Sequence, residues 1–177
     1  MNLFLNIAII IIVVCGILIL YTISYNSFQN YIIRINEAEN NLDGILRKRF
    51  DLLNKSISII KSFDENKENI LECVSKIRSK KLTNFELDRQ LYEGINELQS
   101  YKEEIDGLKT NETFIKIEID LKESEIEIEA YRKYYNNIIT SYNRKVSSFP
   151  TNIVAKISKY KNFPYFEDKE DKEEISI

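Results

Sequence analysis

The chain has 177 residues, of which 44% are hydrophobic and 30% are charged, with only 4 glycines and 2 prolines. Scarcity of these two helix-interrupting residues is typical of a helical protein. The net charge of −3 supplies no basic field for the phosphates of nucleic acid, so we expect no nucleic-acid binding. The chain contains no histidine, which excludes the Glu-x-x-His di-iron site of helical bundles and histidine-activated nucleophiles.

The amino-terminal segment is apolar from Leu3 to Leu20 except for Asn6. A helix needs about 20 apolar residues to cross a bilayer. No basic side chain precedes the run, and the run is longer than the apolar part of a cleaved signal peptide, so we expect residues 1–24 to remain as a transmembrane anchor. Arg34 is the nearest basic residue and lies on the carboxyl side, which favours a short amino terminus outside and the remaining chain in the cytoplasm.

Apolar residues recur at steps of three and four along the rest of the chain, a pattern that predicts amphipathic helices. We expect helices at about 25–62, 65–81, 84–106 and 111–148, and a short helical turn at 151–157. The first continues directly from the anchor. Asp64, Thr83 and Thr151 are suited to begin helices, with Glu86 supporting Thr83, and Gly107 is suited to a left-handed carboxyl-terminal cap. We expect residues 159–177 to form a flexible acidic tail.

One segment is ambiguous, because Ile115, Ile117, Ile119 and Leu121 alternate with charged residues as they would in a strand. We assign it to a helix, since its apolar stripe continues beyond the length of a strand and no turn residue interrupts it. The predicted fold is therefore all-α, with an N-terminal transmembrane helix that continues into an antiparallel up-and-down four-helix bundle over residues 25–158. The alternative, a dimeric coiled coil, would leave the stripes of the other helices uncovered.

Polar residues interrupt the apolar stripes at a few positions. Glu39, Arg49 and Ser56 lie on the stripe of the first soluble helix, and we expect paired or partly exposed side chains there. The acidic row from Glu123 to Glu129 occupies alternate positions, which diverge on a helix, so we expect a solvated face and no metal site. No cofactor is predicted. Nothing in the sequence indicates an enzyme.

Tyrosine and asparagine repeat at a sevenfold interval near the end of the last long helix, as Tyr135-Asn136 and Tyr142-Asn143, before Phe149-Pro150. Core packing explains the tyrosines. Asparagine is a poor interior helix former, so the pair of asparagines indicates either hydrogen bonds between helices or a contact surface. Both interpretations remain open.

The same residues carry a resemblance to a known family. In chain order the matching positions are Tyr25-Asn26, Asp43, Leu46, Arg49, Phe50-Asp51-Leu52, Leu108-Lys109, Asn111, Phe114, Glu125, Ile128, Arg132, Tyr135-Asn136, Tyr142-Asn143, Phe149-Pro150, Ala155 and Tyr165-Phe166. This ordered set resembles the LemA family of bacterial membrane proteins. Glu39 stands where that family usually has tryptophan, and Asn54-Lys55 replaces its usual Pro-Asn.

The resemblance implies a single span, an outward amino terminus, a cytoplasmic helical bundle and no enzymatic activity. We expect a non-enzymatic scaffold or adaptor at the bacterial cell membrane, whose partners are the lipid bilayer and an unidentified membrane-associated protein. The alternatives are a self-associating membrane rod, which would be a homo-oligomer, and an enzyme that uses carboxylates alone. Candidate interaction or structural residues are Arg49, Asp51, Arg132, Tyr135, Asn136, Tyr142, Asn143, Phe149 and Pro150.

Overall fold

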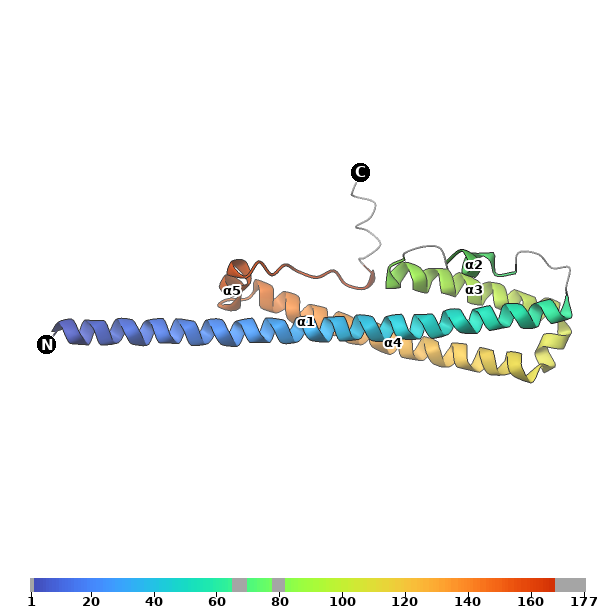
Figure 1. The fold of residues 1–177 in the computed structure, drawn as a ribbon, viewed down its shortest axis with the longest axis horizontal. Helices are drawn as coiled ribbons and strands as arrows, with labels where there is room; N and C mark the ends of the chain where they lie inside the picture. The colour runs from blue at the N-terminus through green and yellow to red at the C-terminus, as the bar shows by residue number, and fades with distance from the viewer. Residues whose placement is uncertain (1, 65–69, 78–81, 168–177) are drawn as a thin grey trace, which may run out of the picture. The chain divides into compact units, whose positions relative to one another are not determined.

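The computed structural model describes residues 2–64, 70–77 and 82–167, and these residues form helices with no strand (Figure 1). The elements are α1 (Asn2–Phe63), α2 (Glu72–Ile77), α3 (Asn84–Glu104), the short 3₁₀ helix η1 (Asp106–Thr110), α4 (Glu112–Ser147) and α5 (Thr151–Ile157). The all-α prediction is confirmed. The segment that alternates like a strand lies inside α4, where Ile117 and Leu121 are buried while Ile115 and Ile119 are exposed.

Helix α1 is continuous over 62 residues. Its amino-terminal part contains an 18-residue window with a mean hydropathy of 3.2, none of which is buried in the protein. Among the described residues it is the one helix long and apolar enough to cross a membrane, as the sequence predicts for residues 1–24. The helix also passes through Asn54-Lys55 without a break, and the Asn54 amide donates to the Phe50 carbonyl 3.1 Å away.

The described residues fall into two compact units. The first, here called the anchor unit, comprises Met1–Glu37 and Asn136–Tyr165. The second, the bundle unit, comprises Ala38–Tyr135 and Phe166–Ile177, of which the structure describes the residues up to Glu167.

The bundle unit has the predicted up-and-down order. Glu39 and Arg49 of α1 contact Asn84 and Asp88 of α3, so these two helices run in the same direction. The direction of α4 is opposite to both, because contacts pair Glu39 with Tyr135 at one end and Lys102 with Glu118 at the other. Short helix α2 packs beside α3, where the Leu71 amide donates to Glu97. Helices α1, α3 and α4 share one core, which is built from buried side chains of the predicted stripes: Leu42, Leu46, Leu53, Ile60, Leu91, Leu98, Phe114, Ile117, Leu121 and Ile128.

Helix ends agree with the sequence at two places. The Thr83 hydroxyl accepts from the Glu86 amide while the Glu86 carboxylate accepts from the Thr83 amide, which is the predicted capping box of α3. The Asn111 side chain accepts from the Phe114 amide at 2.9 Å and so caps α4. Each cap supplies partners for amides that a helix leaves unpaired in its first turn.

Three predicted helix boundaries or caps are wrong. Ile70 and Leu71 form a turn where the prediction had helix 65–81, and Leu71 adopts a φ of 48° that is incompatible with an α-helix. Residues 65–69 and 78–81 of that predicted helix lie outside the described residues. Gly107 has no positive φ, so it is not a left-handed cap; a Cβ there would lie 2.5 Å from the Phe63 ring, which would have to move to admit a larger residue. Thr151 does not cap α5, because its hydroxyl donates backwards to the Ser148 carbonyl.

The anchor unit has an aromatic core. Phe28 and Tyr142 pack edge to face at 5.8 Å, and the rings of Tyr160 and Phe163 cover them at 4.8 Å from Phe28 and 5.1 Å from Tyr142. Tyr160 and Phe163 belong to residues 159–167, which the prediction assigned to the tail; they pack against helices here. Residues 168–177 of the predicted tail lie outside the described residues.

Candidate functional site

A buried arginine lies at the centre of the bundle unit. Arg49 occupies the apolar stripe of α1, and its side chain is only 1% exposed. Its Nε donates to the Ser124 hydroxyl at 3.1 Å, its Nη1 donates to the Asp88 carboxylate at 3.3 Å, and its Nη2 is paired with Glu125. Three of its donors are therefore satisfied, which a buried guanidinium requires.

Asp88 is the carboxylate that joins this arginine to a second one. It projects from α3, its side chain is 8% exposed, and its second oxygen is ion-paired with Arg132 of α4. One carboxylate thus lies between two guanidiniums, and Glu125 supplies the second negative charge. We call Arg49, Asp88, Glu125 and Arg132 the charge network. Arg49 and Asp88 are buried, whereas Glu125 is 49% exposed, so the two buried charges are opposite in sign and the two partly exposed groups complete a balance of two positive and two negative charges.

Arg132 is the more exposed arginine, with 32% of its side chain accessible. Its guanidinium lies 5.0 Å from the centre of the buried Phe166 ring, a cation–π distance. Burial lowers the pKa of Arg132; Glu167 opposes that shift and the nearby Arg49 adds to it. Its Nε is buried and has no hydrogen-bond partner among the described residues.

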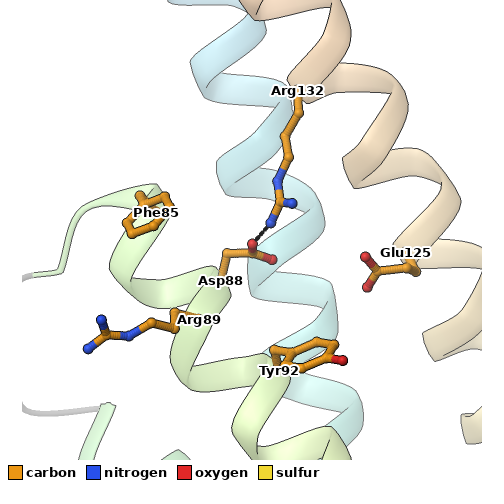
Figure 2. A pocket seen from close by; sticks show the side chains of 6 residues that line it. All are labelled: Phe85, Asp88, Arg89, Tyr92, Glu125 and Arg132. Atoms are coloured by element: carbon orange, nitrogen blue, oxygen red, sulfur yellow. Dashed lines mark ion pairs between the residues drawn. The ribbon is translucent and has the colours of Figure 1, made fainter. Parts of the chain in front are cut away.

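A pocket of about 280 Å³ opens beside the charge network (Figure 2). It is lined by Phe85, Asp88, Arg89, Tyr92, Glu125 and Arg132. Figure 2 shows Asp88 of α3 and Arg132 of α4 pointing toward each other, whereas Arg89 points away from them. Tyr92 is 55% exposed, so an aromatic ring lies on the accessible side of the pocket.

A model of the LemA family matches residues 38–177. The chain belongs to the LemA family. The matched range contains the whole charge network and every residue that lines the pocket. A comparison with curated proteins found no match.

The structure brings three of the predicted residues of this LemA-family chain together in the bundle unit. Arg49 and Arg132 share Asp88, and the Tyr135 ring lies 6.4 Å from the Phe166 ring that Arg132 covers. The Tyr135 hydroxyl donates to Glu39 at 3.3 Å, so the residue that replaces the family's usual tryptophan accepts a hydrogen bond from α4. Burial, and then the neighbouring Glu39, raise the pKa of Tyr135.

Asp51 does not join the charge network and is exposed on α1.

The other predicted residues belong to the anchor unit. Tyr142 is buried in its aromatic core, whereas Phe149 and Pro150 are exposed. The Asn143 amide donates to the Phe163 carbonyl and accepts from the Phe163 amide, both at 2.9 Å. An internal hydrogen-bonding role therefore accounts for Asn143. Asn136 is half-buried, and its backbone carbonyl accepts from the Thr140 hydroxyl at 2.8 Å.

Asp88 is the functional candidate that the sequence prediction missed. Its position carried a signal, because Asp88 follows Phe85 by three residues and precedes Leu91 by three, within the apolar stripe of α3. An acid on such a stripe indicates a buried partner of opposite charge. Among the described residues, no group of three or more histidine, cysteine or acidic side chains is placed to hold a metal ion.

Proposed function

We propose that this LemA-family chain is a non-enzymatic scaffold, anchored in the bacterial cell membrane by α1, whose pocket between α3 and α4 docks a protein partner. One observation carries the proposal: the pocket combines the accessible Tyr92 ring with Arg132, whose guanidinium is held in place by the ion pair with the buried Asp88. Tyrosine and arginine are the residues most enriched where protein interfaces concentrate their binding energy.

The charge network supports a binding role in preference to a catalytic one. Asp88 accepts from two arginines and is 8% exposed, so it is committed to structural ion pairs. Arg132 is held between Asp88 and Phe166, which lowers the conformational entropy that a partner would have to remove on binding. A rigid side chain of this kind binds a partner at smaller entropic cost than a free surface arginine.

Photocrosslinking in intact membranes tests the pocket. A photoreactive residue is placed at Tyr92 in the full chain, and a matched probe is placed at Glu103, which is exposed on the last turn of α3. We expect a discrete heterologous adduct from position 92 that is absent from position 103. Equal adducts from both positions, or none from position 92, would contradict docking at this pocket.

A second candidate function, self-association, is favoured by a different surface of the bundle unit. Ile115, Ile119 and Ile126 of α4 are 37%, 52% and 71% exposed, and their spacing of four and seven places them along one helix face. A probe at Ile126 that yields an adduct of twice the 20.9 kDa chain mass would support a homo-oligomer. A chain that stays monomeric in mild detergent would contradict it.

The proposed orientation places the amino terminus outside and the bundle unit in the cytoplasm, on the basis of Arg34 alone among nearby basic residues. A single cysteine at the exposed Glu123, in a chain with Cys15 and Cys73 replaced by serine, reports the compartment. We expect an impermeant maleimide to label it in lysed cells and not in intact cells. Labelling of intact cells would reverse the orientation.

A further inference from the structure

The anchor unit exposes a group of apolar side chains at and before α5. Phe149, Ile153 and Ile157 are 80%, 52% and 64% exposed. Ile153 and Ile157 are four residues apart and therefore lie on one face of α5, whereas Val154 and Ala155 on the other side are buried. Three large apolar side chains exposed within nine residues indicate a surface that another apolar phase covers.

Contacts within the same unit place this surface at the level where the apolar run of α1 ends. The Tyr21 hydroxyl lies 3.3 Å from the Ser158 hydroxyl, immediately after α5, and the Tyr25 and Tyr160 rings are 6.2 Å apart. Tyr21 also stacks on Tyr25 at 6.2 Å. Tyrosines gather at the boundary between lipid and water, because their rings are apolar and their hydroxyls polar. Figure 1 shows α5 beside this part of α1.

Basic residues lie on α5 and directly after it. Lys156, Lys159 and Lys161 are exposed, and no acidic residue lies between Thr151 and Tyr165. Lysines beside an apolar helical face favour the surface of a membrane that contains anionic lipid.

We infer that Phe149, Ile153 and Ile157 insert into the interfacial layer of the same bilayer that holds α1, with the three lysines at the anionic headgroups. We assign lipid as the phase that covers this apolar face, because α1 holds α5 at the end of the apolar run, where lipid is the neighbouring phase. This inference rests on the proposed anchoring of α1. It adds a second membrane contact, which lies far from the span in sequence and adjacent to it in the fold.

Depth-dependent fluorescence quenching tests the contact in the full chain, reconstituted in vesicles of phosphatidylglycerol and phosphatidylethanolamine that carry a spin-labelled lipid. In a chain with Cys15 and Cys73 replaced by serine, single cysteines at Ile12, Ile33 and Ile153 each receive the same environment-sensitive dye. Ile12 lies in the apolar run. Ile33 is 62% exposed and lies ten residues beyond Ile23 on α1, about 15 Å further along the helix.

We expect the lipid quencher to act at Ile12 and Ile153 and not at Ile33, and replacing Lys156 and Lys161 with glutamate to reduce quenching at Ile153 alone. Quenching at Ile12 without quenching at Ile153 would overturn the α5 contact and leave the anchor intact. Absence of quenching at Ile12 would overturn the anchor and the inference with it. A dye at Ile153 shielded from water yet not quenched by lipid would mean that protein covers this face, which also overturns the inference.

Discussion

Replacing Asp88 with asparagine removes the negative charge between Arg49 and Arg132 and, because the two side chains have nearly the same shape, opens no cavity. Loss of one partner from a buried ion pair costs about 3–5 kcal/mol, since the remaining charge is left uncompensated. Arg49 is 1% exposed but keeps Ser124 and Glu125, and Arg132 is 32% exposed and can turn to water. We therefore expect Asp88→Asn to lower the free energy of unfolding by about 3 kcal/mol.

Thermal unfolding followed by circular dichroism in mild detergent measures this change. For a chain of this size each kcal/mol corresponds to roughly 2–4 °C, so Asp88→Asn should lower the Tm by about 6–12 °C. Arg49→Met is the matched comparison, because it replaces a buried cation with an apolar side chain of similar length and leaves Asp88 paired with Arg132. We expect it to cost about 1 kcal/mol, since exchange of a buried charge for a well-packed apolar group is often close to neutral.

Two comparisons are decisive: which of the two substitutions lowers the free energy of unfolding more, and whether their effects add. In the Arg49→Met background, Asp88→Asn should cost about 1 kcal/mol or less, because only the partly exposed Arg132 loses its partner. Equal losses from Asp88→Asn and Arg49→Met, or additive losses in the double variant, would refute a shared carboxylate that compensates a buried arginine.

Three further predictions concern other parts of the chain. Burial raises the pKa of Tyr135, so the folded state keeps a proton that the unfolded chain releases above pH 10.0, and the free energy of unfolding should fall above that pH. In denaturant titrations at a series of pH values, Tyr135→Phe should reduce this dependence on pH by up to about 1.4 kcal/mol per pH unit. A Cβ at Gly44 meets nothing within 4 Å, so Gly44→Ala should raise the free energy of unfolding by about 0.5–1 kcal/mol, whereas Gly107→Ala should lower it by about 1 kcal/mol. Denaturant titrations in which Gly107→Ala is as stable as Gly44→Ala, or more stable, would contradict the steric account. Asn143→Ala should cost about 2 kcal/mol and speed hydrogen exchange at the Phe163 amide, and normal exchange there would contradict the hydrogen bond.

Local patterns were sufficient to predict the long helices. Apolar steps of three and four over α1, α3 and α4 correspond to buried stripes, and the Thr83–Glu86 capping box begins α3 at the expected residue. These features depend on residues close together in sequence. The alternating segment near Ile117 was assigned correctly because the stripe around it extends further than its strand-like part.

Elements that depend on distant residues were predicted less well. The segment that includes Leu71 has a helical composition, yet Leu71 takes a left-handed φ and its amide donates to Glu97 of α3. Gly107 resembles a helix cap in sequence, whereas the structure places it against the Phe63 ring, 44 residues earlier in the chain. Single-chain periodicity carries no information on such contacts.

The charge network was predicted only in part for the same reason. Arg49 and Arg132 were candidates, but the sequence alone does not show that Asp88 lies between them, because three helices must meet at one level before the three side chains touch. A charged residue on an apolar stripe identifies a position that needs a partner. Tertiary packing determines which residue supplies it.

Stability alone does not account for the charge network, because well-packed apolar side chains in its place would often stabilise a bundle equally or better. Charges differ from apolar groups in their geometry. An apolar stripe packs acceptably after a shift of one turn, whereas Asp88 reaches both Arg49 and Arg132 only when α3 has one register against α1 and α4. Two of the three residues that hold this register, Asp88 and Arg132, also line the pocket. An all-apolar replacement of the three should therefore retain a helical bundle while removing the constraint on register and the polar side chains of Asp88 and Arg132 from the pocket. Retained stability with loss of binding in that variant would show that the charge network contributes to binding more than to the stability of the bundle.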